Sequence, residues 1–230
     1  MWGGVFLKKI LVCSGKGGVG KTTVAVNLAR AFAAKGRRVG LLDADINTSN
    51  APIILGFTER KPLEVKDNRI IPHEANGVKV VSYWFDTADV PHLLWSADRV
   101  VKILKALCKD VDWGVLDLLI IDSPPTTADE LIGVINLLEN IDAAILIVQG
   151  STRSSVQDSK LAKLTLDYYK VPVVGFVQNM VSKYFDEGAD VESELGVPKL
   201  GEIGLKQKLK VEDFVPIAEK LEEVLNWPKN

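Results

Sequence analysis

Residues 9–23 read KILVCSGKGGVGKTT, an apolar run followed by a glycine-rich loop and the start of a helical pattern. The loop fits the pattern G-x-x-x-x-G-K-S/T, with Gly15 and Gly20 at the fixed glycine positions and Lys21 and Thr22 after them. Glycines let the backbone curl, so that successive N–H groups converge on a phosphate at the start of the helix. The stretch therefore predicts a phosphate-binding loop between a strand and a helix. A glycine-rich turn that only closes a strand does not explain Lys21 and Thr22.

This loop also predicts a site for ATP and Mg²⁺. Lys21 is expected against the β- and γ-phosphates, and the hydroxyl of Thr22 is expected to ligate the metal. The residues expected to hold the nucleotide are Gly15, Lys16, Gly17, Gly18, Val19, Gly20, Lys21, Thr22 and Thr23.

Length and composition favour one large α/β domain over residues 1–230, in a soluble protein with 47% hydrophobic and 25% charged residues. The net charge is −2, so no global positive field recruits nucleic acid or anionic lipid, and we expect neither as a partner. No apolar run reaches the roughly 18 residues that span a bilayer. The lysines of the first residues follow a very short apolar patch, the reverse of a secretory signal, so the expected location is the cytoplasm.

Apolar runs alternate with helical patterns along the chain, and several runs are apolar at successive positions, which is typical of strands covered on both faces. The fold class predicted is α/β, a doubly wound and mainly parallel sheet with helices on both faces. Residues 56–76 interrupt the alternation and are interpreted as a hairpin or excursion. The predicted strands are Lys9–Cys13, Arg38–Leu42, Val78–Ser82, Leu116–Ile121, Ala143–Val148, Val173–Val177 and Lys199–Ile203. The predicted helices are Lys21–Lys35, Ala97–Lys109, Ala128–Glu139, Ser155–Tyr169 and Pro216–Trp227.

Three carboxylates follow predicted strands. Asp43 and Asp45 end the second strand, and both should face the ligand crevice at the carboxyl edge of the sheet. Asp122 ends the buried run LLIID, and beside a phosphate-binding loop it is expected to bind the metal through water. A helix-capping role is the alternative for an aspartate in this position.

Lys16 resembles the additional lysine of the deviant Walker A ATPases, a group that includes MinD, ParA, arsenical-pump and nitrogenase iron-protein ATPases. The resemblance implies a homodimer that encloses two ATP molecules, with Lys16 of each subunit reaching the nucleotide of the other. It also implies that Asp45 orients or deprotonates the attacking water, that Asp43 holds Mg²⁺ through water, and that Asn179 bonds the adenine edge. Taken alone, Asn179 is an ordinary turn residue after a strand.

Longer blocks resemble the Mrp branch of this group. Residues 110–130 read DVDWGVLDLLIIDSPPTTADE, residues 39–57 read VGLLDADINTSNAPIILGF, and residues 195–205 read LGVPKLGEIGL. The resemblance extends over roughly residues 8–225. It implies an ATPase that binds and delivers iron–sulfur clusters at its dimer interface and serves a protein client or an assembly partner.

Two departures from the Mrp pattern concern the cargo. The segment after Asn179 lacks the Cys-Pro-x-Cys pair that ligates the cluster in that family, and the two cysteines present, Cys13 and Cys108, do not form such a clip. Residues 126–130, the expected switch II, carry two fewer glycines than the family pattern. Cluster binding by this chain is therefore left open, and a MinD/ParA-like positioning or regulatory ATPase is the alternative function.

Overall fold

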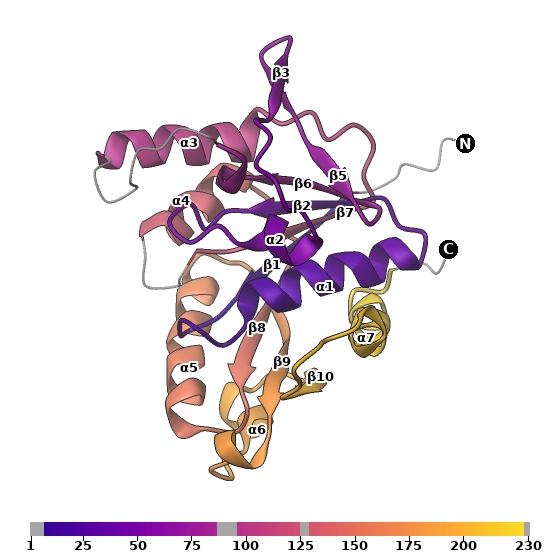
Figure 1. Ribbon diagram of the computed structural model, residues 1–230. Coiled ribbons are helices and arrows are strands. Elements are labelled where there is room, and N and C mark those ends of the chain that lie inside the picture. The colour runs from indigo at the N-terminus through magenta and orange to yellow at the C-terminus, as the bar shows by residue number, and fades with distance from the viewer. Residues whose placement is uncertain (1–6, 87–95, 125–128, 228–230) are drawn as a thin grey trace.

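The computed structural model describes residues 7–86, 96–124 and 129–227. These residues form a central sheet with helices packed on both of its faces (Figure 1). The sheet has eight strands in the order β10-β9-β8-β1-β7-β2-β6-β5, and all neighbours pair in parallel except β5 and β6. The strands are β1 Lys8–Cys13, β2 Val39–Asp43, β5 His73–Ala75, β6 Val78–Ser82, β7 Leu118–Asp122, β8 Ala143–Gln149, β9 Val173–Val181 and β10 Lys199–Gly204.

Successive residues of β1 point to opposite faces of the sheet and thereby enter two separate apolar cores. Ile10 and Val12 pack with α1, α2 and α7, whereas Leu11 and Cys13 pack with α3, α4, α5 and α6. The two layers of helices lie on opposite sides of the sheet in Figure 1. The helices are α1 Lys21–Ala34, α2 Ala51–Leu55, α3 Ala97–Lys109, α4 Asp129–Leu138, α5 Arg153–Tyr168, α6 Val191–Leu195 and α7 Val215–Val224. The short 3₁₀ turns are η1 Tyr83–Phe85, η3 Lys183–Phe185 and η4 Val211–Asp213.

The seven predicted strands and five predicted helices are all present, with ends that differ by a few residues. The predicted hairpin within residues 56–76 is confirmed as β3 Glu64–Lys66 paired with β4 Arg69–Ile71. The sequence analysis missed β5, which follows that hairpin and adds an antiparallel edge to the sheet. It also missed α2 and α6, each only five residues long.

Parallel pairing brings the carboxyl ends of β1, β7 and β2 to one edge of the sheet. Asp43 at the end of β2 lies directly opposite Asp122 at the end of β7. Val12 of β1 also lies opposite Asp122, and the glycine-rich loop leaves β1 two residues later. Residues that are distant in the sequence thus meet where ligands bind in open α/β sheets.

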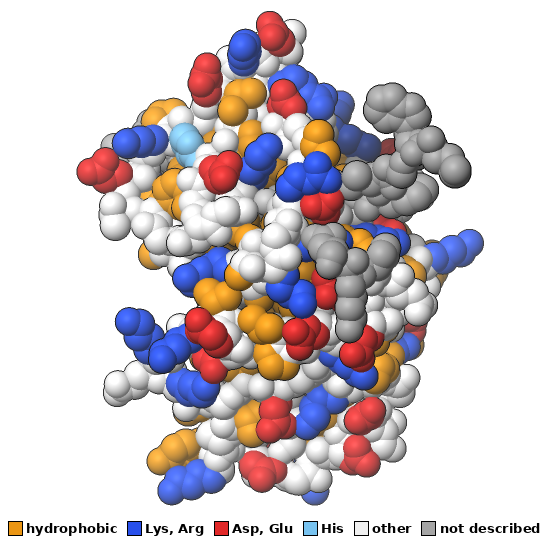
Figure 2. Space-filling model, turned by 90° about the vertical axis from the view of Figure 1, so that its right-hand side faces the viewer, with side chains coloured by type: hydrophobic (Ala, Val, Ile, Leu, Met, Phe, Trp, Pro, Cys, Tyr) orange, Lys and Arg blue, Asp and Glu red, His pale blue; other side chains and the backbone are white. Residues whose placement is uncertain are grey.

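On the face shown in Figure 2, basic and acidic side chains are interspersed over the described surface. Within the described residues, no helix is long and apolar enough to cross a bilayer.

Candidate nucleotide site

The glycine-rich loop is held against two other parts of the chain so closely that two of its glycines are obligatory. A Cβ atom on Gly15 would lie 2.1 Å from the backbone carbonyl of Asp158 in α5. Gly20 has a φ of 85°, and a Cβ there would lie 2.3 Å from Nδ2 of Asn179. Gly20 is also the N-cap of α1 and makes no side-chain cap, so the first N–H groups of α1 remain available to a phosphate.

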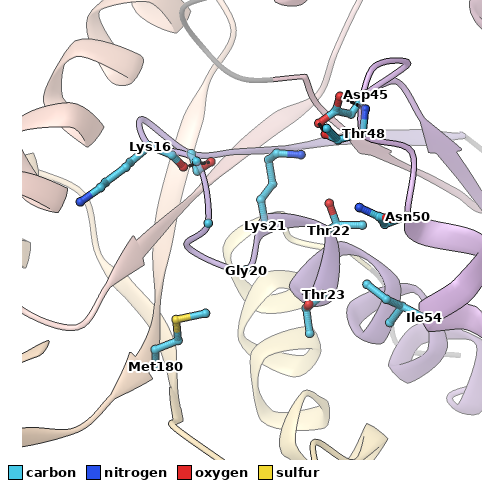
Figure 3. Close-up of a pocket in the computed structure, with 13 residues that line it drawn as sticks. Lys16, Gly20, Lys21, Thr22, Thr23, Asp45, Thr48, Asn50, Ile54 and Met180 are labelled. Carbon is cyan, nitrogen blue, oxygen red and sulfur yellow. Dashed lines mark hydrogen bonds between the residues drawn. The ribbon is translucent and has the colours of Figure 1, made fainter. Parts of the chain in front are cut away.

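A cleft of about 410 Å³ opens in front of this loop (Figure 3). Its volume lies in the range of small-molecule and cofactor sites. Most of its lining comes from the loop and the start of α1, and the remainder from the segment after β2 and the end of β9. The lining residues are Ser14, Lys16, Gly17, Gly18, Gly20, Lys21, Thr22, Thr23, Asp45, Thr48, Asn50, Ile54 and Met180.

Lys21 and Asp122 form a buried ion pair at the base of the loop. The distance from Nζ of Lys21 to Oδ1 of Asp122 is 2.7 Å, and both side chains are almost entirely removed from solvent. Burial acts to lower the pKa of Lys21, but the charge and hydrogen bond of Asp122 outweigh it and raise that pKa. The lysine is therefore a stable cation where a polyphosphate would lie.

The other oxygen of Asp122, Oδ2, is buried and has no hydrogen-bond partner among the described residues. Burial raises the pKa of Asp122, while Lys21 and the hydroxyl of Thr22 favour its charged form. A hard cation such as Mg²⁺ takes oxygen ligands, commonly one or two carboxylates together with phosphates and water. Within the described residues, no three His, Cys, Asp or Glu side chains form a metal cluster. Asp122 and Thr22 thus fit a magnesium ion that takes its other ligands from a nucleotide and water.

Asp45 faces the cleft, whereas Asp43 lies behind it. The carboxylate of Asp45 accepts two hydrogen bonds from Thr48, at 3.1 Å from the backbone nitrogen and 2.7 Å from the hydroxyl. Asp43 is fully buried and does not line the cleft. Burial and the neighbouring Asp122 raise the pKa of Asp43 to about 8. The roles of these two aspartates in water activation and metal binding stay predictions.

Lys16 is exposed, and its side chain extends away from Lys21, as Figure 3 shows. Within its own subunit its ammonium group is therefore not placed beside Lys21 at the base of the loop. That orientation is compatible with a role toward a second subunit, which stays a prediction.

Asn179 lies inside β9, behind the loop rather than in the cleft. Its Nδ2 donates to the backbone oxygen of Val19 at 2.8 Å, and its side chain is buried. The neighbouring Met180 lines the cleft in its place. The adenine contact expected of Asn179 stays a prediction, and its visible contact supports the loop.

The sequence analysis missed five residues that line the cleft, Ser14, Thr48, Asn50, Ile54 and Met180. Thr48, Asn50 and Ile54 lie in or before α2. This helix was not predicted because it has only five residues and carries Pro52 in its first turn. Their position after the carboxyl end of β2 was the available signal. Residues 126–128 of the expected switch II lie outside the described residues.

The two cysteines do not resemble a cluster site. Cys13 is fully buried in β1 and Cys108 is mostly buried on α3, and burial raises the pKa of each thiol to about 12. The segment after Asn179 carries no cysteine and instead closes against the start of α5. There Ser151 donates to Asp186 at 2.5 Å, and the backbone nitrogen of Arg153 donates to Glu187 at 2.8 Å.

Residues 6–225 match the ParA family described as the NUBPL iron-transfer P-loop NTPases. The chain belongs to this family. It is 35% identical over 215 residues to the iron–sulfur cluster carrier protein of Methanocaldococcus jannaschii, covering 88% of this chain and 74% of that protein. It is 34% identical over 212 residues to the iron–sulfur cluster carrier protein of Bacillus subtilis, covering 86% of this chain and 58% of that protein. The NUBPL-type chain thus spans little more than half the length of that bacterial relative.

Solved structures agree with the family assignment and the fold. The nucleotide-binding protein of Archaeoglobus fulgidus in complex with ADP has a TM-score of 0.71 at 27% identity, covering 93% of this chain and 88% of that one. The septum site-determining protein MinD of Pyrococcus horikoshii, complexed with Mg-ADP, has a TM-score of 0.73 at 21% identity, covering 95% and 97%. The predicted α/β fold and the Mrp/MinD-type resemblance are confirmed.

Proposed function

We propose that this chain is a cytoplasmic, Mg²⁺-dependent ATPase whose residues 1–230 act as one P-loop domain and form a homodimer with ATP. The observation that carries the proposal is the buried ion pair between Lys21 and Asp122 beneath the open N-terminus of α1. The pair supports the proposal because it would supply a cation for the phosphates and a carboxylate for the metal in one site. The ADP complexes of the two structural relatives support nucleotide binding here.

Different residues of the chain bind the phosphates, hold the metal and activate the water in the proposed hydrolysis. The N–H groups of the loop and Lys21 bind the phosphates, and Lys21 exchanges Asp122 for them as the nucleotide enters. Thr22 and, through water, the freed Asp122 would hold Mg²⁺, which would neutralise phosphate charge. Asp45 orients the attacking water and accepts its proton, because it is the carboxylate that faces the cleft.

Lys16 is proposed to act across the dimer. Its side chain is exposed and directed away from its own Lys21, so its charge is available to a nucleotide held by a second copy. A cation delivered to the phosphates as charge moves to the leaving group would act as an arginine finger does. Closure of the dimer would then couple hydrolysis to a change in the surface offered to a partner.

We propose that this switch serves iron–sulfur proteins through a client or assembly partner that supplies the cluster ligands. The family and the relatives named as cluster carriers support the iron–sulfur context. Cys13 is buried in β1 and Cys108 is a single, partly buried thiol on α3, so the two do not form the cysteine pair that a bridging cluster needs. The missing Cys-Pro-x-Cys pair is the observation that keeps a MinD/ParA-like positioning or regulatory ATPase as the second candidate function.

A matched pair of aspartate variants tests the ATPase proposal. Asp122→Asn should reduce phosphate release by about 10²-fold or more, since it removes a metal ligand and the lysine's counter-charge. Asp142→Asn is the control, because Asp142 pairs with Lys8 at the opposite edge of the sheet. Phosphate release and dimer mass by sedimentation are measured with ATP, with and without Mg²⁺. A wild-type chain that binds no ATP, or an Asp122→Asn chain with full turnover, contradicts the proposal.

A further inference from the structure

The carboxylate of Asp43 is occupied by donors from its own subunit. Oδ1 accepts from the backbone nitrogen of Asp45 at 3.3 Å. Oδ2 accepts from the hydroxyl of Ser82 at 2.7 Å and lies 3.4 Å from the backbone nitrogen of Ala51. The side chain is fully buried and takes no part in the cleft lining. Its contacts are those of a side chain that stabilises the fold of its own subunit rather than of a side chain that binds a ligand.

The two backbone donors lie on either side of the segment that forms one wall of the cleft. Residues 45–51 connect β2 to α2, and Asp45, Thr48 and Asn50 from this segment line the cleft. Within the segment, Ser49 donates to the backbone oxygen of Asp45 at 2.7 Å, so the loop is closed upon itself. Asp43 holds the first and last residues of this closed loop.

Ser82 fixes the position of the Asp43 carboxylate. It ends β6, the strand beside β2, and is Asp43's direct partner in the strand register. Its buried hydroxyl donates to Asp43 and accepts from the backbone nitrogen of Trp84 at 3.1 Å, so both of its roles are filled. Because the hydroxyl of Ser82 accepts one hydrogen bond and donates the other, its own position is fixed, and it fixes the orientation of the Asp43 carboxylate.

We propose that Ser82 and Asp43 form a positioning pair that holds residues 45–51, and through them Asp45, against the nucleotide. The pair acts through Asp45 and touches neither the nucleotide nor the metal. The assignment rests on the proposed ATPase function for its kinetic consequence, but its structural consequence is measurable without catalysis. It differs from the metal-water role that family resemblance implies for Asp43.

Ser82→Ala is the primary variant, because it removes a buried hydroxyl without changing the identity of any residue that lines the cleft. Small misplacements of a catalytic group cost up to about 10²-fold in rate, so we expect kcat to fall about 10-fold or more. The dissociation constant for Mg-ATP should stay within about threefold of wild type, since no phosphate or metal ligand changes. In the nucleotide-free chain, hydrogen exchange of the backbone amides of Asp45 and Ala51 should accelerate about 10-fold or more. This is the loss of protection expected when a buried hydrogen bond is removed.

Two further variants separate positioning from a general loss of stability. Ser155→Ala removes an equally buried hydroxyl, which accepts from the backbone nitrogen of Gln149, and should leave exchange in residues 45–51 unchanged. Ser82→Thr keeps the hydroxyl and should restore kcat and slow exchange. The added methyl has room because Ser82 borders an apolar cavity of about 250 Å³ under α3.

The outcomes distinguish this proposal from the ATPase proposal. If Ser82→Ala leaves both kcat and exchange of residues 45–51 at wild-type values, the positioning pair is wrong. It is also wrong if Asp43→Asn leaves that exchange unchanged but raises the Mg²⁺ concentration for half-maximal activity about tenfold, as loss of a metal-site contact would. Faster exchange in Ser82→Ala supports the pair even if wild type hydrolyses no ATP, a result that would overturn the ATPase proposal alone.

Discussion

Lys21 and Asp122, 101 positions apart in the sequence, meet at 2.7 Å beneath the phosphate-binding loop. Lys21 begins α1 and Asp122 ends β7, the strand paired with the one that leads into the loop. Each neutralises the other in a site that excludes water, where an unpaired charge would be costly. In the proposed site, a nucleotide that arrives with Mg²⁺ would offer both residues a replacement partner, so metal and phosphate would bind together.

Loss of Lys21 should abolish nucleotide binding. Lys21→Ala removes the cation that we propose faces the β- and γ-phosphates, and it leaves Asp122 buried beside Asp43 without a counter-charge. We expect the affinity for ATP, measured by calorimetry, to fall by about 10²-fold or more, since a buried charge contact of this type is worth several kcal/mol. Binding at wild-type affinity in this variant would contradict the assignment of the site.

Loss of Lys16 should spare binding and remove turnover. Lys16 is exposed and directed away from Lys21, so Lys16→Ala should bind ATP within a few-fold of wild type. Turnover and the ATP-dependent dimer should both disappear, because the lysine is proposed to complete the partner's site. Sedimentation with ATP and phosphate release are measured on the same preparation. Normal hydrolysis by Lys16→Ala would rule out the dimer with two enclosed nucleotides.

Asp45→Asn should trap an ATP-bound dimer. The amide keeps the shape of the side chain but does not accept a proton from water, so turnover should fall by about 10²-fold or more. Single-turnover hydrolysis is measured beside Asp43→Asn, with the Mg²⁺ dependence of both variants. Should Asp45→Asn hydrolyse ATP at the wild-type rate while Asp43→Asn stalls at normal Mg²⁺ affinity, Asp43 is the group that activates water.

A buried ion pair joins helix α7 to the segment between α1 and β2. Nη2 of Arg37 lies 3.0 Å from Oε1 of Glu222, with both side chains almost fully buried, and the guanidinium also stacks on Trp227 at 4.6 Å. Glu222→Gln removes the carboxylate that pairs with Arg37 and lies 3.4 Å from Lys35, and it should lower the free energy of unfolding by about 3 kcal/mol in denaturant titration.

Glu219→Gln on the same helix is the matched control for this change. Glu219 lies 3.5 Å from Lys35 with a side chain that is 57% exposed, so its loss should be close to neutral. A double-mutant cycle with Arg37→Met should show a coupling energy of about 1 kcal/mol or more between Arg37 and Glu222. Equal effects of the Glu219 and Glu222 variants would mean that the buried pair contributes nothing specific.

The parts of the structure predicted from sequence are those whose determinants lie next to one another. The loop from Gly15 to Thr22 carries its glycines, lysine and threonine in one run, and the strands are continuous apolar segments. Short elements were not predicted because three to five residues are too few to show a periodic pattern of apolar side chains. β5 has three residues, and its place is decided by pairing with β6 rather than by an apolar run.

Side-chain direction was the other limit. Asp43 and Asp45 are both in DAD, yet Asp43 ends β2 and lies behind the cleft, whereas Asp45 follows the strand and lines the cleft. The difference arises because Ser82, 39 positions away, binds Asp43 from the neighbouring strand. Asn179 likewise followed the family pattern in sequence, while the structure shows its amide bonded to Val19.

The purified chain should hold no stable iron–sulfur cluster on its own thiols. Cluster ligands are thiolates, and this chain offers only Cys13 on β1 and Cys108 on α3, with burial raising the pKa of each thiol. Two single thiols on separate elements do not form the cysteine pair that a bridging cluster needs from each subunit. Cys13 is fully buried in β1, two residues before the phosphate-binding loop, where a cluster would displace the core and the nucleotide site. After anaerobic incubation with iron and sulfide and then desalting, we expect iron and sulfide contents far below stoichiometry and no visible absorption band.

The Cys13→Ser, Cys108→Ser double variant separates a specific cluster from adsorbed iron, because residual iron that persists in it has no thiol ligand in this chain. Cys108 is the more accessible of the two, so two copies of it across a dimer could hold only a labile species that desalting removes. A stoichiometric cluster that is present in wild type and absent from the double variant would falsify the prediction. It would also show that the buried thiols open on assembly, and a direct carrier role would replace the proposed dependence on a partner's ligands.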